Sequence, residues 1–169
     1  MKGIVITSHG PMAQGILETS KLFFGEQPQI KACCLNADDN PVDFVDVLKD
    51  AIKEVDTGDG VVVFCDMLFG SPCNCMARVV AEDIDSDKIQ VLTGVNLAMI
   101  LQVLSVREAS DPSLEELLKS GTDGIVDLKA ILKANMYKQS GMKLLKMLCR
   151  IFYRFLCDLY FYALERRKK

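Results

Sequence analysis

The sequence has only one histidine, His9, and it lacks the ligand sets of common metal sites. Cys73-Asn74-Cys75 is too closely spaced for an ordinary metal pair, and the second pair of cysteines or histidines that a zinc site needs is missing. A Walker A sequence, a kinase glycine-rich loop and an obvious cluster of metal-binding carboxylates are absent as well. We therefore expect a protein that uses no metal ion or other cofactor and does not use ATP directly.

A secretory signal and an ordinary membrane span are also missing. No hydrophobic signal region precedes the cysteines, and their number, seven, is odd. Residues 142–169 are apolar in part, but charges recur there every few positions, whereas a membrane span needs about 20 mostly apolar residues. These features predict a cytoplasmic protein with reduced thiols.

Charge divides the chain into two parts. Residues 1–134 contain 11 Lys/Arg and 21 Asp/Glu, a net charge of -10, whereas residues 135–169 contain 9 and 2, a net charge of +7. Half of the 169 residues are hydrophobic, and the length suits one domain of about 100 to 200 residues with an extension. We predict an acidic domain over residues 1–134 and a basic tail over residues 135–169, and we expect no nucleic-acid partner.

Short β-branched apolar runs alternate with longer segments of helical periodicity. Four strand-then-helix units in a row are typical of an α/β fold with a mainly parallel sheet and helices on both faces. We expect an open four-stranded sheet in the common order 2-1-3-4. The predicted strands are Gly3–Thr7, Gln29–Leu35, Gly60–Cys65 and Lys88–Leu92, and the predicted helices are Pro11–Phe24, Pro41–Val55, Ser71–Glu82, Asn96–Val106 and Ser113–Lys119.

This strand order places His9 and Asp66 at the same edge of the sheet, on neighbouring strands. His9 ends the first strand and Asp66 follows the third, and in such sheets sites form outside the carboxyl ends of strands where the order reverses. The two side chains should therefore meet in one crevice, although 57 residues separate them. A lone histidine is more often structural, and Asp66 by itself could cap a helix, but their shared position favours a functional role.

Each of these residues is followed by the start of a helix, at Gly10-Pro11 and at Gly70-Ser71-Pro72. Helix N-termini present free N–H groups and a partial positive charge that suit an anion. A neutral imidazole can attack a phosphoryl group, while a carboxylate bonded to the other ring nitrogen fixes the tautomer. We predict His9 Nε2 as the nucleophile, Asp66 as its orienting group, and Gly10, Gly70 and Ser71 as phosphoryl-binding groups.

Three segments carry a family resemblance. Ile4 to Gly15 (IVITSHGPMAQG), Asp66 to Asn74 (DMLFGSPCN) and Thr93 to Met99 (TGVNLAM) resemble the EIIA domain of the mannose family of the bacterial phosphoenolpyruvate-dependent sugar phosphotransferase system, with the same order and similar spacing. The match covers roughly residues 1–130. It implies a phosphotransferase component in which His9 accepts a phosphoryl group from phospho-HPr and passes it to an EIIB partner, with the membrane components EIIC and EIID involved indirectly.

The resemblance has further implications. Asp66 matches the aspartate that bonds the phosphorylated histidine. For Asn96 we expect a supporting role, in which its side chain fixes its own turn through hydrogen bonds to the backbone, rather than the alternative of a direct part in catalysis. Family members form homodimers that exchange a C-terminal strand, and Gly124–Leu132 (GIVDLKAIL) occupies the matching place. A regulatory phospho-acceptor module and a dihydroxyacetone kinase phosphocarrier subunit are the alternative functions.

Two features depart from the family pattern. The family usually has Gly-Gly before the Ser/Thr-Pro of the second segment, whereas this chain has Phe69-Gly70, and a side chain at position 69 disfavours a positive φ. The second departure is the tail, where residues 142–169 predict one basic amphipathic helix rather than a Pro/Ala-rich linker. Such a helix could contact an anionic membrane surface or a protein, pack on its own dimer, or be sequence foreign to the family.

Overall fold

The computed structural model describes residues 1–82 and 86–138. The chain divides into two units, Met1–Thr122 and Asp123–Lys169, and each is described here by itself. The predicted domain boundary at residue 134 stays a prediction. The predicted helix over residues 142–169 lies outside the described residues.

The first unit is built on a four-stranded parallel sheet. Its strands are β1 Gly3–His9, β2 Ile30–Leu35, β3 Val61–Cys65 and β4 Ile89–Thr93, in the order β2-β1-β3-β4. Val5 pairs with Lys31 of β2 on one side and with Val63 of β3 on the other. The predicted α/β fold and strand order are therefore confirmed, and β1 runs two residues further than predicted, so that it includes His9.

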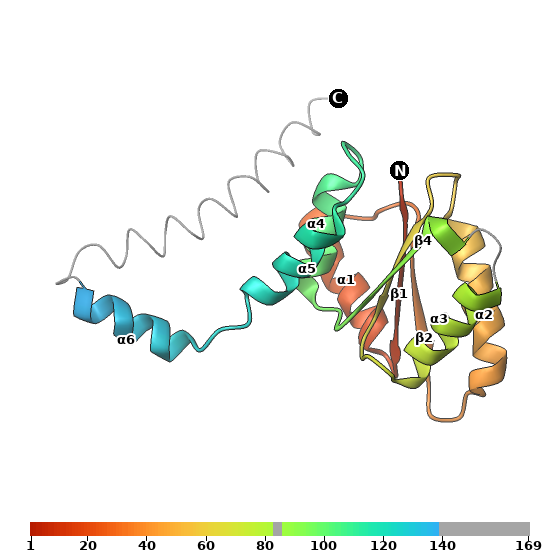
Figure 1. Cartoon of the computed structure of the whole chain (residues 1–169), viewed down its shortest axis with the longest axis horizontal. Coiled ribbons are helices and arrows are strands. Elements are labelled where there is room, and N and C mark those ends of the chain that lie inside the picture. Colours follow the sequence, from red (N-terminus) through yellow and green to blue (C-terminus); the bar gives the residue numbers. More distant parts are fainter. Residues whose placement is uncertain (83–85, 139–169) are drawn as a thin grey trace. The chain divides into compact units, whose positions relative to one another are not determined.

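Helices cover both faces of this sheet (Figure 1). One face carries α1 Met12–Phe24, α4 Leu97–Val106 and α5 Leu114–Asp123, and the other carries α2 Pro41–Val55 and α3 Ser71–Glu82. A single turn of 3-10 helix, Ser86–Lys88, leads into β4. Parallel strands need such covering helices because the crossover connections lie on the faces of the sheet.

The core forms as two layers because successive side chains of a strand point to opposite faces. In β3, Val61, Val63 and Cys65 pack against α2 and α3, whereas Val62 and Phe64 pack toward α1 and α4. All five residues are fully buried, which makes β3 the most completely enclosed strand, as its unbroken apolar run predicts. Burying side chains of this size contributes about 1.5 to 3 kcal/mol each.

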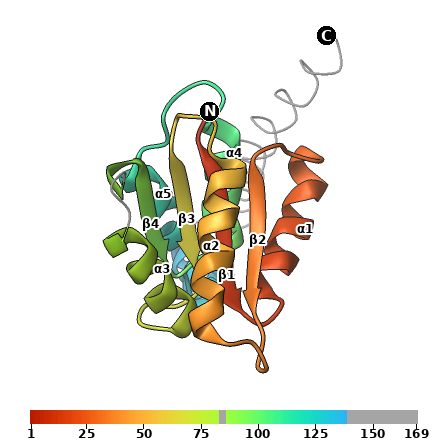
Figure 2. The same cartoon turned by 90° about the vertical axis from the view of Figure 1, so that its right-hand side faces the viewer.

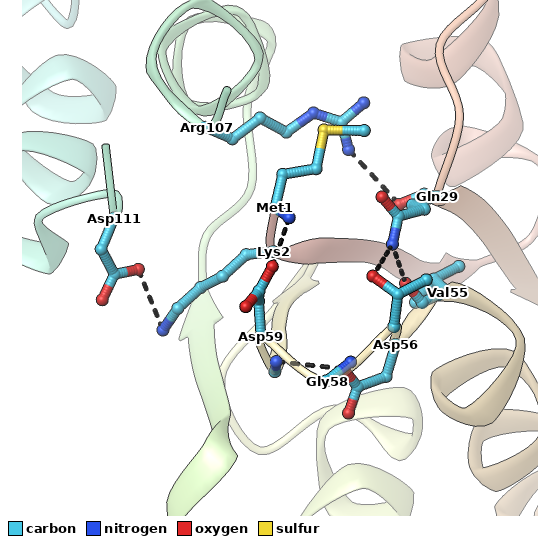
Figure 3. A network of polar contacts seen from close by, with 11 residues as sticks. Met1, Lys2, Gln29, Val55, Asp56, Gly58, Asp59, Arg107 and Asp111 are labelled. Carbon is cyan, nitrogen blue, oxygen red and sulfur yellow. Dashed lines mark hydrogen bonds and ion pairs between the residues drawn. The ribbon is translucent and has the colours of Figure 1, made fainter. Parts of the chain in front are cut away.

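Polar contacts tie elements together at the amino end of the sheet (Figure 3). Lys2 Nζ lies 3.2 Å from Asp111 Oδ1, and the amino group of Met1 pairs with Asp59. Arg107, at the end of α4, is 2% exposed and donates to the carbonyl oxygens of Pro28 and Gln29, which precede β2. These bonds connect the segment between α1 and β2 with the C-terminal end of α4.

The described part of the second unit contains α6 Leu128–Lys138. The Asp127 carboxylate accepts a hydrogen bond from the Ala130 N–H at 3.1 Å and so caps this helix. The resemblance predicts an exchanged strand at Gly124–Leu132, but in this single chain residues 128–138 are helical and residues 125–127 have no regular structure. Strand exchange involves a second chain and stays a prediction. Across residues 1–82 and 86–138, no helix is both long and apolar enough to cross a membrane.

Candidate functional site

Pairing between β1 and β3 brings the two predicted site residues together. Thr7 pairs with Cys65, and the Asp66 N–H donates to the Thr7 carbonyl at 3.1 Å, which extends the ladder by one bond. Asp66 therefore leaves the sheet directly beside the last residues of β1. Its side chain is 10% exposed, whereas the imidazole of His9 is 44% exposed.

Asp66 holds His9 through two hydrogen bonds. One carboxylate oxygen, Oδ2, lies 2.7 Å from His9 Nδ1 and accepts the His9 backbone N–H at 2.8 Å. Because a carboxylate oxygen can only accept, Nδ1 carries the hydrogen in this pair, and Nε2 is the ring nitrogen left for another group. The predicted meeting of His9 and Asp66 is confirmed.

Gly70 supports the imidazole from another side. A Cβ atom placed on Gly70 would lie 2.6 Å from His9 Cε1, so no larger residue fits there without moving the ring. The His9 ring is thus bounded by the Asp66 carboxylate at Nδ1 and by the backbone of Gly70 at Cε1. Sequence reasoning predicts Gly70 as a phosphoryl-binding group, and the structure adds this close approach to the ring.

The turn after His9 is held by Ser8, which sequence reasoning missed. The Ser8 hydroxyl is buried, accepts the Ala13 N–H at 2.7 Å and donates to the Gly10 carbonyl at 3.1 Å. Gly10 has a φ of +52°, and its N–H donates to Leu35 O at 2.8 Å. Its predicted phosphoryl-binding role would require that hydrogen bond to break. The sequence carries no specific signal for this bond, because a serine hydroxyl has several local backbone partners to choose from.

The loop after Asp66 contains a tight turn whose third residue is Phe69. The Gly70 N–H donates to Met67 O at 3.3 Å, and Phe69 has a φ of +62°, as the third position of a type II turn requires. The Asn74 side chain donates to Phe69 O at 3.1 Å, and the Asn74 N–H donates to Gly70 O at 2.9 Å. Despite its side chain, position 69 therefore adopts the positive φ that glycine would favour.

Helix α3 begins at Ser71, the first residue of the predicted helix. Because the Gly70 carbonyl accepts the first helical hydrogen bond, Gly70 is the N-cap, and Ser71 is an exposed residue of the first turn. The N–H groups of such a first turn have no partner within the helix. Ser71 directly follows Gly70, the residue whose backbone lies against the imidazole, and its predicted phosphoryl-binding role stays a prediction.

Asn96 stabilises the structure away from the imidazole. Its side-chain oxygen accepts the Met99 N–H at 3.2 Å, which caps α4, and its amide donates to Gly121 O of α5 at 2.9 Å. Both bonds fix the turn between β4 and α4 and tie α4 to α5. This geometry supports the interpretation in which Asn96 holds its own turn, one of the two roles that the sequence leaves open.

Two buried cysteines on the strands that neighbour β1 are poor nucleophiles. Burial raises the pKa of the Cys65 thiol to about 12 and that of the Cys33 thiol to about 11, so both remain protonated at neutral pH. All five cysteines in the described residues are free thiols. Among residues 1–82 and 86–138, no group of three or more His, Cys, Asp or Glu side chains converges on a possible metal position. The Cys65 and Cys33 thiols therefore do not compete with His9 as nucleophiles.

The chain matches known proteins over its first unit. Residues 3–120 match the EIIA-man family model, described as the PTS system fructose IIA component. The mannose-specific EIIAB component of the phosphotransferase system (PTS) of Escherichia coli strain K12 is 31% identical over 131 residues, which cover 75% of this chain and 39% of that protein. The fructose-specific EIIA component of Bacillus subtilis strain 168 is 29% identical over 108 residues, covering 64% of this chain and 72% of that protein.

A solved structure shows the same architecture. The PTS IIA protein associated with the fucose utilization operon of Streptococcus pneumoniae superposes with a TM-score of 0.71 at 28% identity, covering 78% of this chain and 96% of that one. Fold and matches together define the class, the IIA components of the phosphotransferase system. Because the family model covers more than half of the sequence, the chain belongs to the EIIA-man family. It spans about two fifths of the length of the EIIAB protein that it matches.

Proposed function

We propose that this chain is a phosphoryl carrier for sugar uptake, which accepts a phosphoryl group on His9 from phospho-HPr and transfers it to an EIIB partner. The observation that carries this proposal is the 2.7 Å contact between His9 Nδ1 and Asp66 Oδ2, with the ring 44% exposed. A histidine fixed at one nitrogen and accessible at its edge can react at the other nitrogen. Family membership supports the same reading.

The reaction uses the two ring nitrogens differently. The Nε2 lone pair attacks phosphorus, an N–P bond forms, and the bond from phosphorus to the donor breaks, which leaves a positive charge on the imidazole. Asp66, hydrogen-bonded at Nδ1, stabilises that charge and holds the ring in place, so its role is to position His9. Transfer to EIIB is the same displacement with the phosphorylated Nε2 as the leaving group.

The phosphoryl oxygens need hydrogen-bond donors. The first turns of α1 and α3 both begin at the edge of the sheet where His9 lies, and helix N-termini favour anions. We assign this role to the first turn of α3 with the Ser71 hydroxyl. Gly10 is the weaker candidate because its N–H already donates to Leu35 O.

The proposal also extends to the assembly. The chain would work in the cytoplasm as a homodimer, next to EIIC and EIID, which carry the sugar through the membrane. It needs no metal or cofactor, because the donor protein brings an already activated phosphoryl group.

The test is incubation with phosphoenolpyruvate, Enzyme I and HPr. The wild type should acquire an acid-labile phosphate, His9→Ala should acquire none, and addition of EIIB should remove the label from the wild type. An unlabelled wild type, or equal labelling of His9→Ala, would exclude the phosphocarrier role. A label that no EIIB can remove would instead indicate a regulatory phospho-acceptor.

Asp66 is tested in the same assay. We expect Asp66→Ala to slow phosphoryl transfer about 10-fold to 100-fold, because the imidazole loses its orienting group, while the thermal unfolding transition stays cooperative. Transfer kinetics equal to those of the wild type would remove Asp66 from the mechanism.

A further inference from the structure

Phe69 has an unfavourable backbone conformation and a side chain that the fold does not bury. Its φ is +62° and its side chain is 80% exposed. For a residue with a Cβ atom, the left-handed region costs about 1 to 2 kcal/mol. An exposed ring recovers little of this cost through packing, so the folded chain alone does not explain a phenylalanine at this position.

The loop fixes the backbone of Phe69 one residue away from the group that contacts His9. Asn74 donates to the carbonyl of Phe69, and the next residue, Gly70, lies directly against the imidazole at Cε1. Phe69 is therefore an exposed aromatic residue directly beside the backbone that contacts the imidazole. A backbone that is already held in one conformation lowers the entropy lost when its side chain binds a partner.

Further exposed apolar side chains lie on the segments that directly follow His9 and Asp66. Met67 is 56% exposed, Leu68 is 55% exposed and Met12, at the start of α1, is 45% exposed. We call these three residues, together with Phe69, the apolar rim. Grouped exposed apolar residues around a reactive group are typical of a protein-binding surface, whose centre is apolar and whose edge is polar.

The polar surroundings of the apolar rim are acidic. The loop between β2 and α2 lies at the same end of the sheet as the loop between β3 and α3 (Figure 2). The segments that form this edge, residues 9–14, 36–43, 66–74 and 94–97, contain four aspartates and no lysine or arginine. Three of these aspartates, Asp38, Asp39 and Asp43, are exposed. A complementary partner would present an apolar pocket surrounded by basic side chains.

We propose that Phe69 is the anchor residue that binds the phosphoryl-donor protein. Its ring inserts into an apolar pocket of the donor, while lysine or arginine side chains of the donor face the acidic edge. This inference rests on the proposed function and goes beyond it, because it assigns partner binding to a residue where the family pattern has glycine. The strain at position 69 is then retained for the sake of recognition, not of folding.

The test compares the full-length Phe69→Gly and Phe69→Ala variants with the full-length wild type, and purified phospho-HPr is the phosphoryl donor. Both variants should raise the KM for phospho-HPr about 10-fold, the size expected for a truncated aromatic anchor, and leave kcat unchanged. Phe69→Gly should also unfold at the same or a higher temperature than the wild type, because glycine adopts a positive φ without strain. The wild-type KM should rise with salt, since the paired charges are screened.

Leu22→Ala is the matched control. Leu22 is 84% exposed on α1, about 15 Å along the helix from Met12, and its replacement should leave the KM unchanged. A KM within twofold of the wild type in Phe69→Gly would overturn the anchor, and so would a fall in kcat alone, which would indicate a role in positioning His9. If the wild type is labelled on His9 but either of these contradicting results is found, only the anchor role of Phe69 is excluded. If the wild type is not labelled at all, the proposed function fails with it.

Discussion

The two ends of the parallel sheet differ in how they use their polar groups. At the amino end, charged groups bond within the chain: Lys2 pairs with Asp111, and Arg107, 2% exposed, donates to two backbone carbonyls. At the carboxyl end, His9 is 44% exposed and Phe69 is 80% exposed with a positive φ. At the amino end, the polar groups thus bond to other parts of the chain, whereas at the carboxyl end His9 and Phe69 are exposed to solvent and to a binding partner.

This difference follows from the direction of the strands. In a parallel sheet all carboxyl ends lie together, and the loops that leave them lead directly into helix N-termini. Backbone strain is retained at functional sites when the surrounding structure holds it in place. Substitutions at the amino end should therefore change stability, and substitutions at the carboxyl end should change reactivity.

Arg107→Met should have the largest effect. It keeps much of the apolar stem but removes the donors to Gln27, Pro28 and Gln29, so the hydrogen bonds that tie the buried end of α4 to the segment before β2 are lost. We expect a loss of about 3 kcal/mol in the free energy of unfolding, measured by urea denaturation. The rate of His9 phosphorylation per folded molecule should not change. A slower rate with unaltered stability would contradict the division between the two ends.

At the carboxyl end, Gly70→Ala should lower the rate of phosphoryl transfer and leave stability largely unchanged. A Cβ atom there lies 2.6 Å from His9 Cε1, so the imidazole must shift away from its position against Asp66. Displacement of a reacting group by about 1 Å can cost on the order of 100-fold in rate. Single-turnover labelling by phospho-HPr measures this loss, and thermal unfolding serves as the control. A full rate of transfer would show that the contact with Gly70 does not position the ring.

Asn96→Ala should have the smallest effect of the three and sharpen the comparison. Asn96 lies near the carboxyl end, but among the contacts described its side chain bonds only to Met99 and Gly121. Loss of the cap and of the bond to α5 should cost about 1 to 2 kcal/mol of stability. The labelling rate should remain that of the wild type. A large decrease in rate at unchanged stability would place Asn96 in the reaction after all.

Much of the fold could be predicted from the sequence because its signals are local. The apolar run Val61–Cys65 coincides with β3, Pro41 marks the start of α2, and Gly25 marks the end of α1. The contact between His9 and Asp66 follows from strand order alone. The hydrogen bonds of Ser8 and Asn74 do not follow from the sequence in this way. A single serine or asparagine has many local backbone partners, and only the folded loop selects one of them.

The sequence by itself determined the parallel sheet, its order and the pairing of the only histidine with Asp66, because period and spacing are properties of the chain. Only the tertiary structure decided how that histidine is held. Gly70 packs against its ring, Ser8 fixes the turn behind it, and Phe69 keeps a positive φ. These features depend on distances of a few ångströms between segments far apart in the chain, and such distances exist only once the strands have paired.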